Sequence, residues 1–310
     1  MGVHPPSIWL GFSGLVVVLL VLDLAVLNRR SHVLPMKEAL SWSAVLVVLA
    51  LLFGLFMMSR EGVQHALEFY TGYLIELSLS VDNLFVFILV FQYFGVPAKY
   101  QPRVLKWGIL GAIVMRLVMI MLGAALLQRF SWIIYVFGAV LIVTGVRMAR
   151  SRDEDTIDPS RNIVARAARR FLPFTDHYDG QKFVTRLQGG AIRATPLLLV
   201  LLVVEWTDLV FAIDSIPAIF AVTRDPFLVY SSNIFAILGL RALFFVLAGA
   251  MNRFVYLKIG VAFILVFVGL KMTLSAWIHI PILLSLAVIV GSLATAIGLS
   301  LRKAPAPAGA

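Results

Sequence analysis

The chain alternates long apolar runs with short polar connections, and this pattern predicts helices that cross a membrane. An α-helix needs about twenty mainly apolar residues to cross the hydrocarbon layer. Runs of this kind cover residues 7–28, 39–58, 70–94, 105–127, 130–149, 196–222, 229–250, 254–274 and 281–301. We therefore predict an all-α, polytopic membrane protein with about nine transmembrane helices.

Composition agrees with this prediction. Of the 310 residues, 61% are hydrophobic and 14% are charged, whereas soluble domains are roughly 45–50% apolar and about 25% charged. The sequence has no cysteine, which excludes disulfides, thiolate metal sites and thiol redox chemistry. We expect a single transmembrane domain over residues 1–310.

The basic residues predict the orientation, because cytoplasmic connections carry an excess of Lys and Arg. Alternate connections hold twenty of them: Arg29, Arg30, Lys37, Lys99, Arg103, Lys106, ten residues from Arg147 to Arg193, Arg253, Lys258, Arg302 and Lys303. The remaining connections hold three: Arg60, Arg129 and Arg224. This asymmetry predicts a plasma (inner) membrane protein with its N-terminus outside and its C-terminus in the cytoplasm. It also assigns the net charge of +10 to one membrane face, so we expect no nucleic-acid partner.

One connection, residues 150–195, is long. Within it, residues 161–172 form the pattern of a basic amphipathic helix suited to an anionic lipid leaflet, although a solvated charged loop explains the same residues. Turn residues at 178–180 and 188–190 predict a short strand pair within 174–195. The tail, residues 303–310, is rich in Ala and Pro and is expected to be disordered.

Carboxylates inside the apolar runs are the candidate functional residues. Glu205, Asp208 and Asp214 lie in one run, and Glu76 and Asp82 lie in another with the same six-residue spacing that separates Asp208 from Asp214. An ionised acid at the bilayer centre costs roughly 2.5–3.5 kcal/mol even on lenient scales. A bound cation, protonation or buried basic partners must offset this cost.

The similarity between the two acidic runs continues into the runs that follow them. Residues 108–116 resemble residues 233–241, with an arginine at the end of each, and residues 137–148 resemble residues 261–272. Spans 3–5 (repeat one, 70–149) and spans 6–8 (repeat two, 196–274) therefore read as two copies of a three-helix unit. The predicted topology gives the copies opposite orientation, which is typical of transporters whose substrate site lies at the midplane between inverted repeats.

The predicted metal site takes its ligands from both copies, and all of them offer oxygen. They are Glu76, Asp82, Asn83, Glu205, Asp208, Asp214 and Ser215. Oxygen-only sites suit hard divalent cations such as Mn²⁺, Mg²⁺ or Ca²⁺. Pro217 is expected to interrupt its helix at 213–217 and so turn Asp214 toward the other acids. Arg116, Arg241 and Lys271 are candidate charge partners, and if they pair with the acids a purely structural network explains the same residues.

The two acidic segments also carry a resemblance. Glu76–Asn83, Glu205–Ala218 and the following residues 219–226 resemble the TerC family of integral membrane proteins, and the similarity runs from about span 3 to span 8. The resemblance implies a Mn²⁺ exporter of the inner membrane, in a family associated with manganese efflux, alkaline response and tellurium resistance. The family's intramembrane acids match Glu76, Asp82, Glu205, Asp208 and Asp214.

We therefore expect a secondary transporter that exports Mn²⁺ in exchange for protons, with the metal as substrate and no permanently bound cofactor. The alternative is a membrane scaffold or assembly factor in a tellurite or metal stress-resistance complex, which would use loop 150–195 for docking. The sequence leaves open whether the chain forms a homo-oligomer. We do not expect an enzyme, because the Gly-x-Gly-Asp signature of aspartyl intramembrane proteases is absent.

Overall fold

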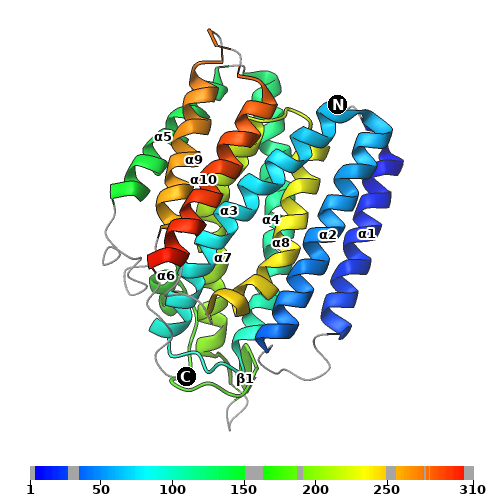
Figure 1. Ribbon diagram of the computed structural model, residues 1–310. Coiled ribbons are helices and arrows are strands. Elements are labelled where there is room, and N and C mark those ends of the chain that lie inside the picture. The colour runs from blue at the N-terminus through cyan, green and yellow to red at the C-terminus, as the bar shows by residue number, and fades with distance from the viewer. Residues whose placement is uncertain are drawn as a thin grey trace.

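The computed structural model describes residues 4–26, 35–130, 132–150, 163–186, 191–248, 256–275, 277–278 and 280–303. The described part of the chain is built almost entirely of helices, which run roughly side by side (Figure 1). The helices are α1 (Pro6–Val26), α2 (Met36–Glu61), α3 (Val63–Tyr93), α4 (Gln101–Arg129), α5 (Ile133–Arg150), α6 (Ile163–Phe171), α7 (Pro196–Phe220), α8 (Pro226–Ala248), α9 (Leu257–Thr273) and α10 (Ile282–Lys303). Two short strands, β1 (Val184–Arg186) and β2 (Ile192–Ala194), pair in antiparallel register.

Seven of the described helices are long and apolar enough to cross a membrane: α2, α3, α4, α5, α7, α8 and α10. α1 is apolar over its described residues 6–22, and α9 has 17 residues. The nine predicted spans fall on α1–α5 and α7–α10 in order, but the count of nine spans stays a prediction. The chain is an integral, multi-pass membrane protein.

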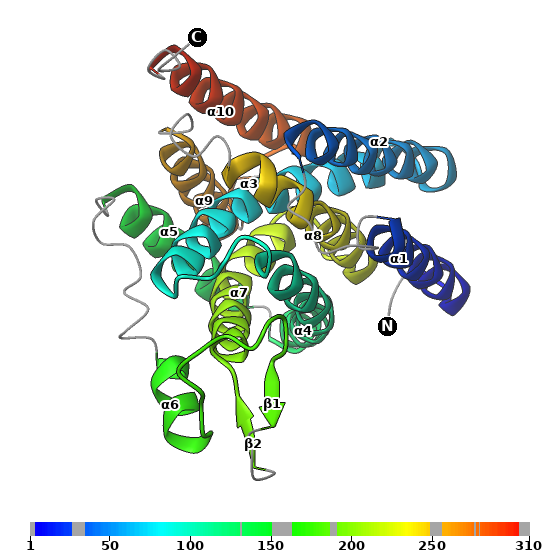
Figure 2. The ribbon, with the colours of Figure 1, turned by 90° about the horizontal axis from the view of Figure 1, so that it is seen from below.

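The helices form a central group and a rim. Viewed along the bundle, α3, α4, α7 and α8 lie near the centre, while α1, α2 and α10 lie at the edge (Figure 2). Most of α8 is buried, whereas α2 exposes apolar side chains such as Leu52 and Phe56. An apolar outer surface of this kind suits lipid, so the polar side chains of the central helices are the ones placed away from it.

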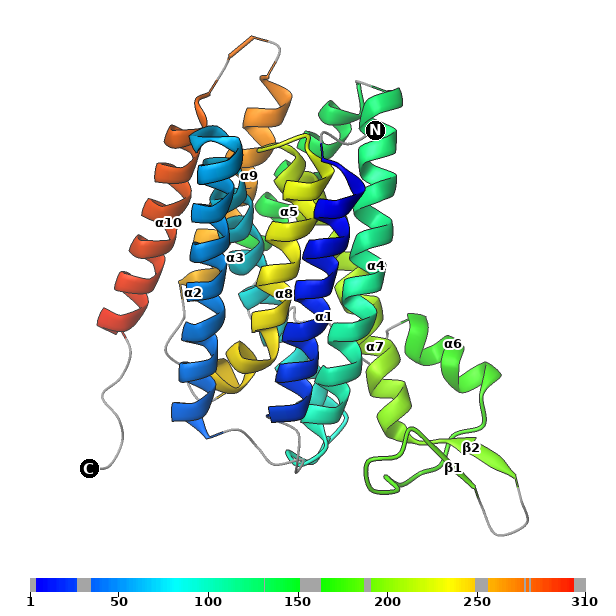
Figure 3. The same cartoon turned by 90° about the vertical axis from the view of Figure 1, so that its right-hand side faces the viewer.

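The helix termini follow from local sequence at two junctions. α2 and α3 are joined by Gly62 alone, whose φ of 96° is a conformation that favours glycine. α8 begins with Pro226, and the preceding Asp225 caps it by accepting a hydrogen bond from the backbone N–H of Phe227 at 2.9 Å. Both junctions lie at the same end of the bundle as the start of α1 (Figure 3).

The long connection folds into α6 and the β1–β2 pair, which project from the other end of the bundle (Figure 3). This confirms the predicted helix within 161–172 and the predicted strand pair within 174–195. α6 buries its small residues Ala165 and Ala168 and exposes Arg169 and Arg170. Residues 151–162 and the tail from 304 lie outside the described residues.

Side-chain contacts attach this connection to the bundle. The Tyr178 hydroxyl donates to the carbonyl of Phe94 at the end of α3 at 2.8 Å, and burial raises the pKa of that phenol. Nearer the strands, Asp179 accepts hydrogen bonds from Thr185 and Lys182, and these contacts lower the pKa of its carboxyl group. The segment beside the strands is therefore ordered by its own polar contacts as well as by the bundle.

The predicted interruption at 213–217 is not present, because α7 is a continuous helix from Pro196 to Phe220. Pro217 lies in the final turn of α7. Its missing N–H removes one backbone hydrogen bond, and only three residues of the helix follow it, so the helix continues to its end without a break. The chain leaves the helix only at Ala221, whose N–H still donates to the carbonyl of Pro217 at 3.0 Å. Asp214 is therefore oriented by a regular helix.

Candidate ion-binding site

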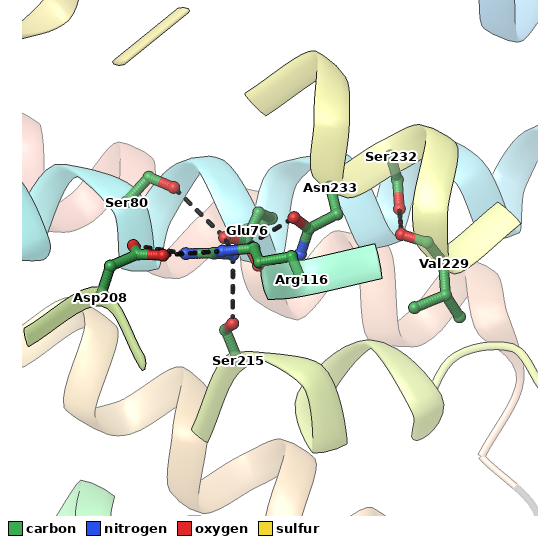
Figure 4. A network of polar contacts seen from close by, with 8 residues as sticks. All are labelled: Glu76, Ser80, Arg116, Asp208, Ser215, Val229, Ser232 and Asn233. Carbon is green, nitrogen blue, oxygen red and sulfur yellow. Dashed lines mark hydrogen bonds and ion pairs between the residues drawn. The ribbon is translucent and has the colours of Figure 1, made fainter. Parts of the chain in front are cut away.

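A fully buried arginine, Arg116 of α4, lies where the four central helices meet. Its guanidinium forms an ion pair with Glu76 of α3 and another with Asp208 of α7 (Figure 4). It also donates to Ser215 Oγ of α7 and to Asn233 Oδ1 of α8, each at 3.3 Å. The carboxylate and amide partners of one cation therefore come from three different helices.

The two carboxylates bind Arg116 differently. Asp208 is held side-on, with Arg116 Nη2 donating to Oδ1 at 3.0 Å and Nε donating to Oδ2 at 3.4 Å. Glu76 accepts through Oε1, which also receives the Ser80 hydroxyl at 3.4 Å. The other oxygen of Glu76, Oε2, is buried and has no hydrogen-bond partner among the described residues. One ligand atom is thus unused within this centre.

Small side chains allow the helices to bring these groups together. A Cβ atom on Gly72 of α3 would lie 3.0 Å from Ser232 Oγ of α8, so these two helices are in close contact. A Cβ atom on Gly111 of α4 would collide with the Glu205 carboxylate of α7. Because α4 carries glycine there, α7 can approach it closely, and Asp208 reaches Arg116 less than one turn further along α7.

Glu205 lies beside this centre rather than in it. It is half-buried and lines a small pocket together with Asp208, and α4 contributes Gly108 and Ala112 to the same pocket. The remaining lining residues are Phe87, Leu105, Ile109, Val204 and Leu240. On α3, α4, α7 and α8 alike, these residues lie on the side of the centre that faces α6 and the β strands. The pocket is therefore on that side of Arg116.

Asp214 does not turn toward Glu76 or Asp208. Its Oδ1 accepts a hydrogen bond from Thr144 Oγ1 of α5 at 2.9 Å. Asn83 is buried, and in the part of the chain that the structure describes its side-chain amide nitrogen has no hydrogen-bond partner. The side chain of Asp82 lies outside the described residues. The structure thus brings together Glu76, Asp208 and Ser215, with Glu205 adjacent.

The other two candidate charge partners lie on other helices of the second repeat. Arg241 is buried on α8. Lys271 of α9 donates to Ser285 Oγ of α10 at 2.9 Å and lines a larger pocket with Gln64 and Glu68 of α3. That pocket is at the end of the bundle where α3 begins, away from α6 and the β strands.

Among the described ion pairs of this centre, Glu76 and Asp208 supply two carboxylates against the one guanidinium of Arg116. Taking charges out of water is costly unless they are paired and hydrogen-bonded, so this excess of acid must be compensated by a proton or a cation. Among the described side chains, no three acids or histidines converge on one point as a ready metal site.

Three residues of this region were absent from the predicted site. Asn233 and Ser80 complete the surroundings of Arg116 and Glu76, and Thr144 binds Asp214. Asn233 carried a usable signal, because it is an amide inside the apolar run 229–250 and polar side chains within spans face the bundle interior. Serine and threonine hydroxyls carry no such signal, because they also bond to their own helix, as Thr71 does to Leu67.

Comparison with known proteins places the chain in a family. The family model described as "Integral membrane protein TerC family" matches residues 61–306. An uncharacterized membrane protein of Myxococcus xanthus, STKORF319, is 52% identical over 301 residues, which are 97% of this chain and 94% of that protein.

Two further relatives match at similar length. The putative membrane-bound redox modulator Alx of Escherichia coli K12 is 49% identical over 300 residues, which are 94% of this chain and 93% of that protein. An uncharacterized membrane protein of Rickettsia felis is 43% identical over 280 residues, which are 90% of this chain and 92% of that protein. No solved structure matches the chain. The match to the family model and the near-complete alignments together establish that this chain belongs to the TerC family of integral membrane proteins.

Proposed function

We propose that this protein exports a divalent cation from the cytoplasm in exchange for protons, and that Mn²⁺ is its main substrate. The observation that carries the proposal is the meeting of Glu76 and Asp208, from separate thirds of the sequence, at one buried centre with more acid than base. Their oxygens, with those of Ser215 and Asn233, are the ligand types that hard divalent cations prefer. The choice of Mn²⁺ rests on the family resemblance.

In the proposed cycle the ion enters from the side of Glu205 and binds the carboxylates of Asp208 and Glu76. Protonation of a carboxylate then weakens its hold on the metal, because a neutral acid is a poor ligand for a hard cation. The predicted ligands Asp82 and Asp214 lie along the same two helices and belong to the proposed ion path, as does the neighbouring Asn83.

Alternating access would follow from two inverted repeats, and helix contacts support this part of the proposal. Glu76 and Asp208 occupy equivalent positions in the aligned repeats, and both contact Arg116. A Cβ on Gly269 of α9 would lie 2.7 Å from the carbonyl oxygen of Gly138 of α5, and one on Gly145 would lie 2.7 Å from that of Ala262. These contacts show that α5 and α9 run antiparallel.

The alignment of 137–148 with 261–272 pairs Gly138 with Ala262 and Gly145 with Gly269. The alignment therefore maps the Gly138–Gly269 contact onto the Gly145–Ala262 contact. A two-fold axis between oppositely oriented copies would relate the two contacts in this way. Rocking of one repeat against the other about such an axis would expose the centre to each side in turn.

Transport by the purified protein in proteoliposomes tests the proposal. We expect uptake of Mn²⁺, driven by a pH gradient, with Mg²⁺, Ca²⁺ and Zn²⁺ compared in parallel. Glu76→Gln and Asp208→Asn should each reduce Mn²⁺ transport at least about a hundredfold, because each removes a charged ligand from the centre. Asp82→Asn and Asp214→Asn test the rest of the path and should abolish manganese tolerance in cells.

Asp176→Asn is the matched control, since it makes the same change at an exposed acid of the long connection. It should transport like the unmodified protein. Normal Mn²⁺ transport by well-expressed Glu76→Gln and Asp208→Asn variants would contradict the proposal.

The second candidate function is a scaffold or assembly factor in a stress-resistance complex. The ordered module of α6, β1 and β2, which projects from the bundle, is the observation in its favour (Figure 3). One relative is named as a putative membrane-bound redox modulator, although this chain has no thiol of its own. Deleting residues 163–194 should abolish function and the acid variants should remain active if this alternative is correct.

A further inference from the structure

Arg116 forms hydrogen bonds with the oxygen atoms that a transported cation would need as ligands. Of the predicted metal ligands, Glu76, Asp208 and Ser215 are all in direct contact with its guanidinium. Asn233 adds its side-chain oxygen. A guanidinium and a divalent ion cannot share these oxygens, because both need the same lone pairs and because like charges at such a distance repel.

The centre also has features of a site that is only partly satisfied by its arginine. Among the described residues, no group donates a hydrogen bond to Glu76 Oε2, which is buried. Arg116 supplies one positive charge to the two carboxylates that it contacts. A divalent ion in its place would neutralise both of them and could use the second oxygen of Glu76.

A small pocket adjoins one side of the centre. The small pocket between Glu205 and Asp208 borders Asp208 directly, and Gly108 and Ala112 of α4 leave room there. Glu205 is only half-buried, so it is the first acid that an ion would meet on the way to the centre. An ion arriving through the pocket reaches Asp208, which is the carboxylate held side-on by Arg116.

We propose that Arg116 is a tethered competitor of the transported ion. Its guanidinium neutralises Glu76 and Asp208 when no ion is bound, the incoming divalent cation displaces it, and its return expels the ion on the far side. This inference rests on the proposed function. If Arg116 competes with the ion, removing the arginine should strengthen metal binding. An arginine with a purely structural role predicts no such gain.

Equilibrium binding of Mn²⁺ to the purified full-length protein tests this inference. Arg116→Ala should bind Mn²⁺ at least about tenfold more tightly than the unmodified protein, because the competing charge is gone. It should also transport more slowly, because nothing expels the ion. Arg129→Ala is the matched control, since it removes the same charge from an exposed position at the end of the same helix. Its affinity for Mn²⁺ should be unchanged.

Free guanidinium, at concentrations far below those that unfold proteins, provides a second readout. It should compete with Mn²⁺ in Arg116→Ala, where it fits the emptied position. In the unmodified protein it should have no effect on Mn²⁺ binding. A structural arginine would not produce this competition.

Arg116→Lys keeps the test decidable if Arg116→Ala does not fold. Lysine retains the charge but cannot hold Asp208 side-on, so its Mn²⁺ affinity should lie between those of the unmodified protein and Arg116→Ala. Unchanged or weaker Mn²⁺ binding by folded Arg116→Lys or Arg116→Ala overturns the inference. If Glu76→Gln still abolishes transport in that case, the proposed function remains supported. If the unmodified protein neither binds nor transports any of the four metals, both the inference and the proposed function are wrong.

Discussion

At the scale of single residues, a second cluster of ionisable side chains surrounds His4, which is buried. His4 Nε2 is 2.6 Å from Asp225 Oδ2, and His4 Nδ1 is 3.1 Å from Glu61 Oε1. The imidazole of His4 therefore lies between two carboxylates and contacts one of them with each ring nitrogen. The cluster joins the segment before α1 to the end of α2 and to the start of α8.

We expect His4→Ala to destabilise the protein by about 1–3 kcal/mol, because it leaves two poorly exposed carboxylates without their partner. Thermal unfolding in detergent measures the effect as a lower midpoint temperature. His177→Ala makes the same change at an exposed histidine of the long connection and should leave the midpoint unchanged. Equal midpoints for His4→Ala and the unmodified protein would show that the cluster adds nothing to stability.

At the scale of helices, the packing of α5 against α9 depends on glycine. Gly138 and Gly145 of α5 face Gly269 and Ala262 of α9, so the two backbones are in contact. Close approach of this kind is how helices pack in a membrane, where the lipid is as apolar as the side chains and van der Waals contact drives association. Thr144, which precedes Gly145 on α5, donates a hydrogen bond to Asp214 of α7.

A methyl group at this crossing should therefore be costly. Gly145→Ala and Gly269→Ala are each expected to destabilise the protein by about 1–3 kcal/mol, because the new Cβ meets a backbone oxygen that cannot move away easily. Thermal unfolding of the purified variants provides the measurement.

Gly14→Ala is the control for these substitutions, since a Cβ there has nothing within 4 Å. Alanine favours helix formation over glycine by about 1 kcal/mol, so this variant should be neutral or more stable. A loss of stability at Gly14 equal to that at Gly269 would contradict the packing argument.

At the scale of the whole molecule, the described elements separate into two ends. The start of α1, the α2–α3 junction and the start of α8 share one end, and α6 with the β strands lies at the other (Figure 3). The excess of basic residues in the connections predicts that the end with α6 faces the cytoplasm. The pocket between Glu205 and Asp208 would then lie on the cytoplasmic side of Arg116, which agrees with the proposed direction of transport.

The absence of cysteine makes this orientation simple to test. In intact cells, a membrane-impermeant thiol reagent should label Gln128→Cys, which is exposed at the end of α4 away from α6. It should not label Asp176→Cys, which is exposed in the long connection. After the cells are permeabilised, both cysteine variants should be labelled. The reverse pattern in intact cells would show that the orientation is opposite and that the pocket faces outside.

The sequence alone was sufficient to predict a helical, multi-pass membrane protein of the TerC family, and to point to Glu76 and Asp208. Hydropathy is a local property that needs only consecutive residues, and the acidic motifs stand out because charge is so costly in a span. The helix and strand pair of the long connection were also predictable, since their patterns are short and local.

Only the tertiary structure decided which of these groups meet. Asp214 lies six residues beyond Asp208, which on a regular helix turns it about 120° away, and so it faces Thr144 instead of Glu76. The placement of Arg116 between Glu76 and Asp208 depends on how α3, α4, α7 and α8 rotate and pack, and small residues such as Gly111 set that packing. Such contacts join residues far apart in the chain, so no local pattern in the sequence specifies them.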